Sequence, residues 1–578
     1  MAPTDQLQEV KIMLHGTAAS EGIGIGKVML IEEHSLEYTP RTVTDTEAES
    51  QRFKAAVDAF CYNTEKQAEN LRSSAGEKEA EILAGHIQII RDPYLSGEIE
   101  KLIADGQCAE SALEHMCDMF IAMFSAADDE LTKQRAADVR DIKSGVLGIL
   151  LGVNEIKVSD APKGTVLVAR ELTPSVTAGI VKENIAGIIT ETGGTTSHSA
   201  ILARALEIPA VLSVEGVASS LKNGDTVVVD GSEGAVIVNP DDNTVAEYSK
   251  KRDAFLAERK ELENYRGRET KSASGEAYEL FCNIGKPEDA VKAVDADGEG
   301  VGLFRTEFLF MDRTSIPTED EQYEAYKKAA LILKGKSLII RTLDIGGDKD
   351  IPYLGLEKEE NPFMGFRAIR YCLKNRELFK SQIKAILRAS AFGDIKIMFP
   401  LITTMDELRE GKKLVAECKA DLRNMGINFN ENIQVGVMVE TASAAVIADM
   451  LAKEADFFSI GTNDLTGYTM ACDRGNNDVS YLYSPLQPSV LRMIKRTIEC
   501  GVQNGISVGM CGEAAANKLM IPLLISFGLT EFSVSAPSVL NVRKIISTWT
   551  KEEADKVTVK VLEMSTQQEI VEYLKSIV

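Results

Sequence analysis

One histidine stands in a loop whose composition suits phosphoryl chemistry. Residues 187–211 read GIITETGGTTSHSAILARALEIPAV, so an apolar strand is followed by Gly193 and Gly194, by hydroxyl residues, and by His198 at the start of a helical pattern. A helix start offers free N–H groups and a positive dipole end, which bind anions and favour the neutral imidazole needed for attack. A lone histidine is more often structural, but this Gly- and hydroxyl-rich setting favours a phosphoryl acceptor at His198.

A second set of polar residues follows the predicted strands of the C-terminal half. The set is Asn283, Arg305 with Glu307, Arg341 with Asp344, Glu440, Asn463 with Asp464, and Cys511 with Glu513. Any one of them could be a rim residue that only bonds to a neighbouring loop. Six strands that end in this way together favour an active site at the carboxyl ends of a parallel sheet.

The residue types in this set indicate the ligand. A cationic pocket in a chain of net charge −24 is predicted from Arg305, Arg341, Arg367, Arg474 and Lys349. Guanidinium groups bind phosphate and carboxylate bidentately, so a small polyanion is the expected substrate.

Three further residues of this set have more than one interpretation. Glu440 and Asp464 end adjacent predicted strands and suit Mg²⁺, which prefers carboxylates, waters and phosphate oxygens. The alternative is that these acids form ion pairs with the same arginines. Cys511 stands at a strand end where a thiol could deliver a proton to a substrate, although it could equally be a small core residue.

The element pattern of the C-terminal half predicts a TIM barrel. Eight apolar segments over about 260 residues are mostly separated by helical stretches, which is typical of eight βα units. A doubly wound open sheet is the alternative, and the count of eight disfavours it. The segments are ELFCNIG, GVGLFRTE, SLIIRTLDIG, IKIMFPLI, QVGVMVE, DFFSIGTND, ISVGMCGE and LTEFSVSA.

The N-terminal half predicts a small α/β domain interrupted by helices. Residues 12–32 read as two short strands, residues 44–151 as a helical bundle, and residues 226–240 as a closing hairpin. Thr244 and Glu247 fit a capping box at the start of a linker helix. The expected domains are therefore 12–43 with 152–240, the helical insertion 44–151, the linker helix 241–268, and the barrel 269–578.

Composition narrows the class of protein. The 578 residues carry 64 basic and 88 acidic side chains, which disfavours a nucleic-acid binder. Nine scattered cysteines without a CxxC pair suggest a reducing cytosol, and no signal peptide or membrane-spanning segment is recognisable. We therefore expect a cytoplasmic protein. Among the other histidines, His86 is either a packing residue or part of a partner surface, and the rest are expected to be structural or exposed (His15, His34 and His115).

The motifs resemble Enzyme I of the bacterial phosphoenolpyruvate-dependent sugar phosphotransferase system. The matching stretches are GGTTSHSAILARALEIPAV, RAADVRDI, GVGLFRTEFLFMDR, RTLDIGGDK, NPFMGFRAIR, FFSIGTNDLTGYT, DRGN and GMCGE. They cover nearly the whole chain in the family's order. Pyruvate phosphate dikinase and phosphoenolpyruvate synthase share the histidine motif but carry an additional ATP-grasp region, for which the insertion at 44–151 is too short.

The resemblance implies a role for each matching residue. His198 would be phosphorylated on Nε2, Thr177 would hold it at rest, and Cys511 would protonate the enolate. Phosphoenolpyruvate ligands would be Arg305, Arg341, Asn463 and Arg474, supported by Arg367, Lys349 and Asp464; Mg²⁺ ligands would be Glu440 and Asp464. The helical insertion would bind the phosphocarrier protein HPr, and the barrel would form a homodimer. The chain departs from the family's usual residues at Thr195, Ala442, Gly467 and 514–517, none of which has an assigned chemical role.

Two rival functions remain open on the sequence. A Mg²⁺-dependent barrel aldolase or lyase acting on phosphoenolpyruvate or pyruvate would leave the GGTTSH loop without a role. A scaffold that binds phosphoenolpyruvate without turnover is favoured by loss of His198 or of a metal ligand, and neither is lost.

Overall fold

The computed structural model describes residues 12–578 with short gaps. The gaps are 32–35, 75–76, 127–129, 154–157, 178, 195–196, 312, 314, 347–350, 358 and 474–475. The chain divides into two compact units, 1–259 and 260–578, each with its own cores. An α/β multidomain fold with a helical insertion and a C-terminal barrel is therefore confirmed.

An eight-stranded sheet forms the base of the first unit. The strands are β1 (Ile12–His15), β2 (Thr17–Ser20), β3 (Ile23–Ile31), β4 (Thr165–Ala169), β5 (Ile185–Thr190), β6 (Ala210–Leu212), β7 (Thr226–Asp230) and β8 (Ala235–Val238). Their order is β1-β8-β7-β3-β4-β5-β6-β2. The predicted hairpin is β7–β8, which pair antiparallel.

The N-terminal segment forms three strands rather than the predicted two. Consecutive strands β1 and β2 lie at opposite edges of the sheet, so the sheet curves until its edges approach each other at Gly16. An added Cβ at Gly16 would lie 2.4 Å from the Leu212 carbonyl oxygen. A glycine is required there by close backbone approach, and the hydrophobic pattern alone did not reveal that break.

Short helices accompany this sheet. They are α6 (Pro174–Thr177), α7 (His198–Leu206) and α8 (Val217–Ser220), with the 3₁₀ turn η1 (Val158–Asp160). Apolar clusters cover both faces of the sheet, one of them including Leu202 and Leu206 of α7. The core therefore fixes the helix that His198 begins.

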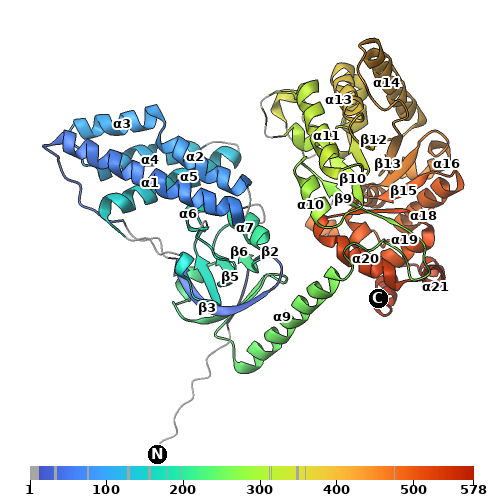
Figure 1. The fold of residues 1–578 in the computed structure, drawn as a ribbon. Helices are drawn as coiled ribbons and strands as arrows, with labels where there is room; N and C mark the ends of the chain where they lie inside the picture. Colours follow the sequence, from blue (N-terminus) through green and yellow to red (C-terminus); the bar gives the residue numbers. More distant parts are fainter. Residues whose placement is uncertain are drawn as a thin grey trace, which may run out of the picture. The chain divides into compact units, whose positions relative to one another are not determined.

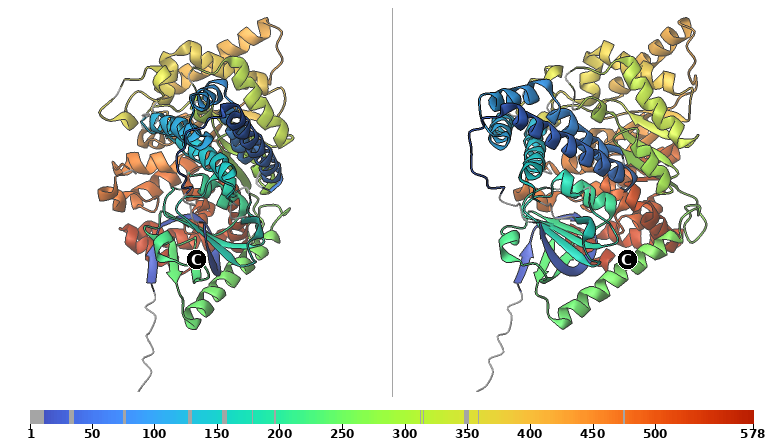
Figure 2. Two further views of the ribbon diagram at one scale, coloured as in Figure 1. Left: turned by 90° about the vertical axis from the view of Figure 1, so that its left-hand side faces the viewer. Right: turned by 60° about the vertical axis from the view of Figure 1, so that its left-hand side comes forward.

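Five helices follow β3 and form a bundle with its own core. They are α1 (Thr46–Ser74), α2 (Glu77–Ile90), α3 (Pro93–Ala104), α4 (Ala109–Ser125) and α5 (Glu130–Leu151). They pack together in each view of Figure 2, around buried side chains such as Phe53, Ile99 and Leu113. His86 is 2% exposed and lies 3.4 Å from Asp138, so it is a packing residue and not part of a partner surface.

A single 22-residue helix, α9 (Asp242–Glu263), follows the sheet. It begins two residues before the predicted cap. Thr244 lies inside the first turn, and its N–H donates to Oδ1 of Asp241 at 2.7 Å. The capping box predicted at Thr244 and Glu247 is therefore wrong, because Asp241 supplies a cap one turn earlier.

The second unit is a closed parallel barrel (Figure 1), as the eight segments predicted. Its strands are β9 (Glu279–Ile284), β10 (Gly300–Arg305), β11 (Leu338–Arg341), β12 (Ile395–Phe399), β13 (Val435–Val439), β14 (Phe457–Ile460), β15 (Ser507–Met510) and β16 (Glu531–Val534). Strand β16 pairs with β9 and closes the barrel. The open-sheet alternative is excluded.

Helices surround this barrel and close its outer core. They are α10 (Asp289–Asp295), α11 (Glu319–Leu333), α12 (Ala368–Lys374), α13 (Arg376–Ala389), α14 (Met405–Asn424), α15 (Ala442–Val446), α16 (Ala448–Leu451), α17 (Thr462–Met470), α18 (Pro488–Gln503), α19 (Ile521–Phe527), α20 (Val539–Thr548), α21 (Lys551–Glu563) and α22 (Gln567–Lys575). Six 3₁₀ turns join them: η2 (Thr306–Leu309), η3 (Pro352–Leu354), η4 (Pro362–Met364), η5 (Asn477–Leu482), η6 (Glu513–Ala516) and η7 (Ala536–Ser538).

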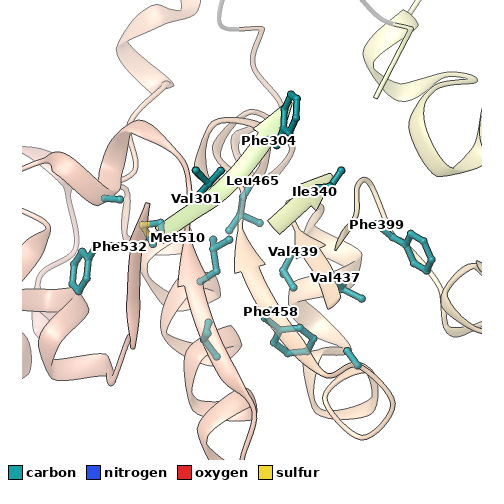
Figure 3. Packing of buried hydrophobic residues seen from close by; sticks show 14 of the residues in the cluster. Val301, Phe304, Ile340, Phe399, Val437, Val439, Phe458, Leu465, Met510 and Phe532 are labelled. Atoms are coloured by element: carbon teal, nitrogen blue, oxygen red, sulfur yellow. The ribbon is translucent and has the colours of Figure 1, made fainter. Parts of the chain in front are cut away.

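Alternate residues of each barrel strand belong to different clusters. Ile340, Val439 and Met510 belong to the large cluster shared with the helices (Figure 3). Ile339, Met438 and Cys511 belong to a separate small cluster. Since side chains alternate across a strand, the small cluster is the barrel interior.

The described residues contain no helix long and apolar enough to cross a membrane. All nine cysteines are free thiols, and eight of them are buried. The cysteines therefore form no disulfide framework.

Candidate functional site

Five of the predicted site residues lie where barrel strands end. Arg305 and Arg341 are the last residues of β10 and β11. Glu440 and Cys511 directly follow β13 and β15, and Asp464 lies in the first turn of α17 after β14. Four of them continue the inward alternation of their strands, while Asp464 is carried by the helix. The carboxyl ends of the strands therefore bring these groups to one mouth.

Arg341 is a buried cation at this mouth, with 7% of its surface exposed. Its Nη2 donates to Oε1 of Glu307 at 2.7 Å, and its Nη1 lies 3.1 Å from Oδ2 of Asp344. Burial opposes the charge, but these two carboxylates outweigh it and raise the pKa of Arg341. Its Nε is buried without a hydrogen-bond partner among the described residues. Arg341 is therefore a charged group at the mouth that two carboxylates of the protein hold in place.

Arg367 is also buried, but protein groups use each of its nitrogen atoms. Nη2 donates to both oxygens of Asp344 at 2.8 and 3.0 Å, and to Oδ2 of Asp464 at 3.3 Å. Nε donates to Asp344 at 3.3 Å, and Nη1 donates to the Tyr468 hydroxyl at 3.3 Å. The ring of Phe363 lies 5.6 Å from the guanidinium carbon. Arg367 therefore orients acids of the mouth, and each of its three nitrogen atoms has a protein partner.

Arg305 differs from both, because the described residues supply no ion pair or hydrogen bond to its guanidinium group. It is half-buried at the end of β10. A charged fork that lacks a protein partner at a barrel mouth suits an anionic ligand.

Glu440 and Asp464 follow neighbouring strands, since β13 pairs with β14. Burial, followed by repulsion from Asp464 and Asp344, raises the pKa of Glu440. Its Oε1 accepts a hydrogen bond from the Leu401 N–H at 2.7 Å. The ion-pairing alternative left open by the sequence therefore holds for Asp464, which pairs with Arg367. Glu440 makes no salt bridge in the described part of the chain, although Arg341 and Arg367 act from farther away to lower its pKa.

This pair of acids fits a divalent cation that takes only part of its ligands from protein. Mg²⁺ is typically bound by one or two carboxylates together with waters and substrate phosphates. The described residues hold no cluster of three or more His, Cys, Asp or Glu suited to a metal. Repulsion from Asp464 adds to burial in raising the pKa of Glu440. A cation bound between the two acids would offset that repulsion.

Cys511 is 4% exposed and stands between β15 and η6. Its Sγ lies 3.8 Å from the Ile460 carbonyl oxygen. Burial raises the pKa of this thiol to about 11, against a smaller lowering by Ser459 and Arg341. The thiol therefore keeps its proton at neutral pH and is available as an acid.

Two residues of the mouth had no assigned role in the sequence interpretation. Tyr468 contacts Arg367, and its hydroxyl also donates to the Phe363 carbonyl. The spacing of Asp464 and Tyr468 in a helix, four residues apart, is a signal that could have linked them. Asn283 was singled out only as a polar strand end, and it contacts the backbone of Cys511.

The histidine loop has the predicted local structure where it is described. Ser197 caps α7, its Oγ accepts from the Ala200 N–H at 3.3 Å, and His198 is the first helical residue. Gly193 has φ +106°, which only glycine adopts readily. Thr177 is buried at the end of α6, which packs against α7. The side chain of His198 and all of Thr195, Lys349 and Arg474 lie outside the described residues, and Asn463 contributes its carbonyl to the Tyr483 hydroxyl at 3.0 Å.

Three family models match consecutive parts of the chain. They are "PEP-utilising enzyme, N-terminal" over 15–135, "PEP-utilising enzyme, mobile domain" over 161–234, and "PEP-utilising enzyme, PEP-binding domain" over 259–550. The boundaries of the second model enclose His198, and those of the third enclose the barrel mouth.

Full-length relatives agree with these models. A protein of Bacillus subtilis (strain 168) named "Phosphoenolpyruvate-protein phosphotransferase" is 46% identical over 570 residues, covering 98% of this chain and 99% of its own. Proteins with the same name from Listeria innocua and Staphylococcus carnosus are 45% and 43% identical over 563 residues, each covering 97% of this chain and 98% of their own.

Proposed function

The chain belongs to the phosphoenolpyruvate-protein phosphotransferase family, Enzyme I, and we propose that it passes a phosphoryl group from phosphoenolpyruvate through His198 to the phosphocarrier protein HPr. It is a transferase of phosphorus-containing groups. The observation that carries the proposal is the cationic barrel mouth, where half-buried Arg305 has no ion pair among the described residues and lies in register with the buried Arg341 of the neighbouring strand. A small polyanion bound at the mouth would pair with Arg305.

The substrate is bound by the arginines that the protein itself leaves available. Arg305 and Arg341 take the phosphate and carboxylate of phosphoenolpyruvate, because a guanidinium fork matches both groups bidentately. Arg474 and Asn463 complete the set, and Lys349 supports it. Arg367 holds Asp344 and Asp464 in place, as its hydrogen bonds with both acids suggest.

Glu440 and Asp464 are the proposed ligands of Mg²⁺. When bound, the cation neutralises charge on the phosphoryl oxygens and helps to orient them. Arg367 holds one oxygen of Asp464, and the Leu401 N–H holds one oxygen of Glu440. These contacts pre-orient the two acids on neighbouring strand ends.

The reaction needs one nucleophile and one acid from the chain. Neutral Nε2 of His198 attacks phosphorus in line and displaces enolpyruvate, while Thr177 holds the ring between turnovers. Positioning and charge neutralisation supply most of the rate enhancement. Cys511, whose thiol burial keeps protonated, then gives its proton to C3 of the enolate to form pyruvate.

The domains divide these tasks. The α/β domain of 12–43 and 152–240 carries His198. The barrel of 269–578 binds substrate and forms the homodimer. The helix within 241–268 follows the movement of the α/β domain between the two phosphoryl transfers. The insertion 44–151 binds HPr. Exposed Met119 and Met123 of α4, 46% and 55% accessible, are apolar side chains that suit a protein partner. We place the enzyme in the cytoplasm, without nucleic-acid partners or membrane insertion.

Incubation with ³²P-phosphoenolpyruvate and Mg²⁺, followed by addition of HPr, tests this function. The enzyme should gain acid-labile, base-stable label and pass it to HPr, with one pyruvate released per label. An aldolase or lyase would consume substrate without labelling the protein, and a binding scaffold would do neither. Either of those results would refute the proposal.

A further inference from the structure

The carbonyl group of Cys511 is held by a side chain from the opposite end of the barrel sequence. Asn283, at the penultimate position of β9, donates through Nδ2 to the Cys511 carbonyl oxygen at 3.0 Å. The two residues are 228 positions apart, and their strands are separated by β16. This hydrogen bond therefore crosses the sheet at the point where the barrel closes.

The bond replaces a missing strand contact. Strand β15 pairs with β16 only at Gly509–Glu531 and Met510–Phe532, so the ladder ends before Cys511. On the other side, the Cys511 N–H donates to the Ile460 carbonyl of β14 at 3.2 Å. The peptide groups that flank the Cys511 side chain are thus held from both sides, by β14 through the N–H and by Asn283 through the carbonyl.

A serine fixes the orientation of the Asn283 amide. Ser533 Oγ donates to Asn283 Oδ1 at 2.7 Å, and Asn283 Nδ2 also reaches the Ser533 carbonyl oxygen at 3.3 Å. Because two carbonyl oxygens face one end of the amide, that end must be the NH₂ group. If the amide were flipped, Oδ1 of Asn283 would face the carbonyl oxygens of Cys511 and Ser533, and no hydrogen would lie between these three acceptors.

We propose that Asn283, oriented by Ser533, is the positioning residue that aims the thiol of Cys511 at one face of the enolate. The proposal rests on the proposed role of Cys511 as proton donor. In that step the S–H bond breaks, the electron pair of the enolate takes the proton to form the C3–H bond, and the thiolate regains a proton from water as pyruvate leaves. The thiol lies 3.8 Å from the Ile460 carbonyl oxygen, which also accepts from the Cys511 N–H, so the position of the thiol follows that of its backbone.

The near-isosteric change Asn283→Asp is the decisive variant. It places carboxylate oxygen against the carbonyl oxygens of Cys511 and Ser533, and repulsion should displace Cys511. Because a displacement of about 1 Å can cost about 10²-fold in rate, we expect turnover to fall ten- to a hundredfold. Affinity for phosphoenolpyruvate should stay within a few-fold, since the arginines supply it.

The readout is the configuration of the methyl group of pyruvate. Phosphoenolpyruvate that carries deuterium at one C3 position is converted in tritiated water, so one-sided protonation gives a chiral methyl group. The full-length wild type should give one configuration, and Asn283→Asp should give a mixture. Asn504→Asp is the matched control, because Asn504 Nδ2 likewise donates to a backbone carbonyl, that of Cys500 at 2.8 Å, at the end of α18.

Ser533→Ala guards against a folding defect in the aspartate variant, since it removes only one hydroxyl. Ser533→Ala should give pyruvate of partly mixed methyl configuration, while its circular dichroism spectrum stays that of the wild type. Unchanged turnover and unchanged configuration in folded Asn283→Asp and Ser533→Ala would overturn the proposal. Unchanged configuration in Cys511→Ala would instead refute Cys511 as the donor, which separates failure of the proposed function from failure of this inference.

Discussion

Arg367 and Asp344 form a bidentate ion pair in which both carboxylate oxygens lie 2.8 and 3.0 Å from Nη2. Asp344 also lies 3.1 Å from Nη1 of Arg341, so one buried acid joins two buried guanidinium groups. Pairs of this kind are costly to break, because one partner is then left buried and uncompensated. The arginines of the mouth should therefore differ in how much stability is lost when each is replaced.

Arg305→Gln and Arg341→Gln should separate binding from stability. Arg305 has no ion pair among the described residues, so its loss should weaken phosphoenolpyruvate binding by about tenfold or more and change unfolding by under about 0.5 kcal/mol. Arg341→Gln removes the buried cation that contacts both Glu307 and Asp344, and it should cost about 3–5 kcal/mol as well as affinity. Calorimetric titration and thermal unfolding measure the two effects. Equal destabilisation by both substitutions would contradict this division.

Cys511→Ala should keep the affinity for phosphoenolpyruvate within a few-fold and lower the turnover of the half-reaction that phosphorylates His198 and forms pyruvate. An uncharged thiol adds little attraction for a polyanion, whereas general acid catalysis is worth about 10²–10⁴-fold. Cys511→Ser should recover little, since a hydroxyl is a poorer acid than a thiol. Rapid-quench measurement of pyruvate gives the rate of the step that needs Cys511. Wild-type rates in both variants would leave bound water or another group as the proton source.

Glu531 should make the stability of the barrel depend on pH. Burial, and to a lesser degree Glu279, raises the pKa of Glu531 to about 8. The folded protein then keeps this proton up to about pH 8, while the unfolded chain releases it above about pH 4.5, so stability falls as pH rises between these values, by up to about 1.4 kcal/mol per unit.

Glu531→Gln should remove the contribution of this carboxyl to the pH dependence of stability. The variant should match the wild type near pH 5 and unfold several degrees higher at pH 8, as followed by calorimetry. Glu563→Gln, at the exposed end of α21, is the control. A wild-type pH dependence in Glu531→Gln would show that this carboxyl is already ionised in the folded barrel.

Met119→Asp with Met123→Asp should impair the second transfer and spare the first. Two charges on the exposed face of α4 should weaken docking of HPr, while the barrel and α7 stay intact. Label transfer from phosphoenzyme to HPr measures the effect, with Met425→Asp, an exposed methionine after α14, as control. Normal transfer in the double variant would place the HPr surface elsewhere.

Strong periodic signals allowed much of the fold to be predicted. Eight apolar segments predicted the closed barrel, and the polar residues that end six of them, Arg341, Glu440 and Cys511 included, predicted a site at the carboxyl ends of its strands. Parallel strands buried on both faces are short, near-continuous apolar runs, so their length and regular spacing between helices identified them. The split of β1 and β2 at Gly16 escaped prediction, because the contact that requires glycine comes from Leu212, nearly 200 residues later.

Pairings within the mouth could not be read from the sequence. Residue types placed Arg367 with the substrate ligands, whereas its nitrogens are used by Asp344, Asp464 and Tyr468. Asn283 could be recognised only as a polar strand end, because its partners lie 228 and 250 residues away. Such contacts depend on barrel closure, which no local pattern encodes.

The most direct test of the central claim is the site of phosphorylation. After incubation of the full chain with phosphoenolpyruvate and Mg²⁺, mass spectrometry under alkaline conditions should locate one phosphoryl group on the peptide containing His198. His198→Ala should carry none, and it should still bind phosphoenolpyruvate with nearly wild-type affinity in a calorimetric titration, because the proposed ligands lie on the barrel. Phosphorylation at another residue, or persistence of the label in His198→Ala, would contradict the account.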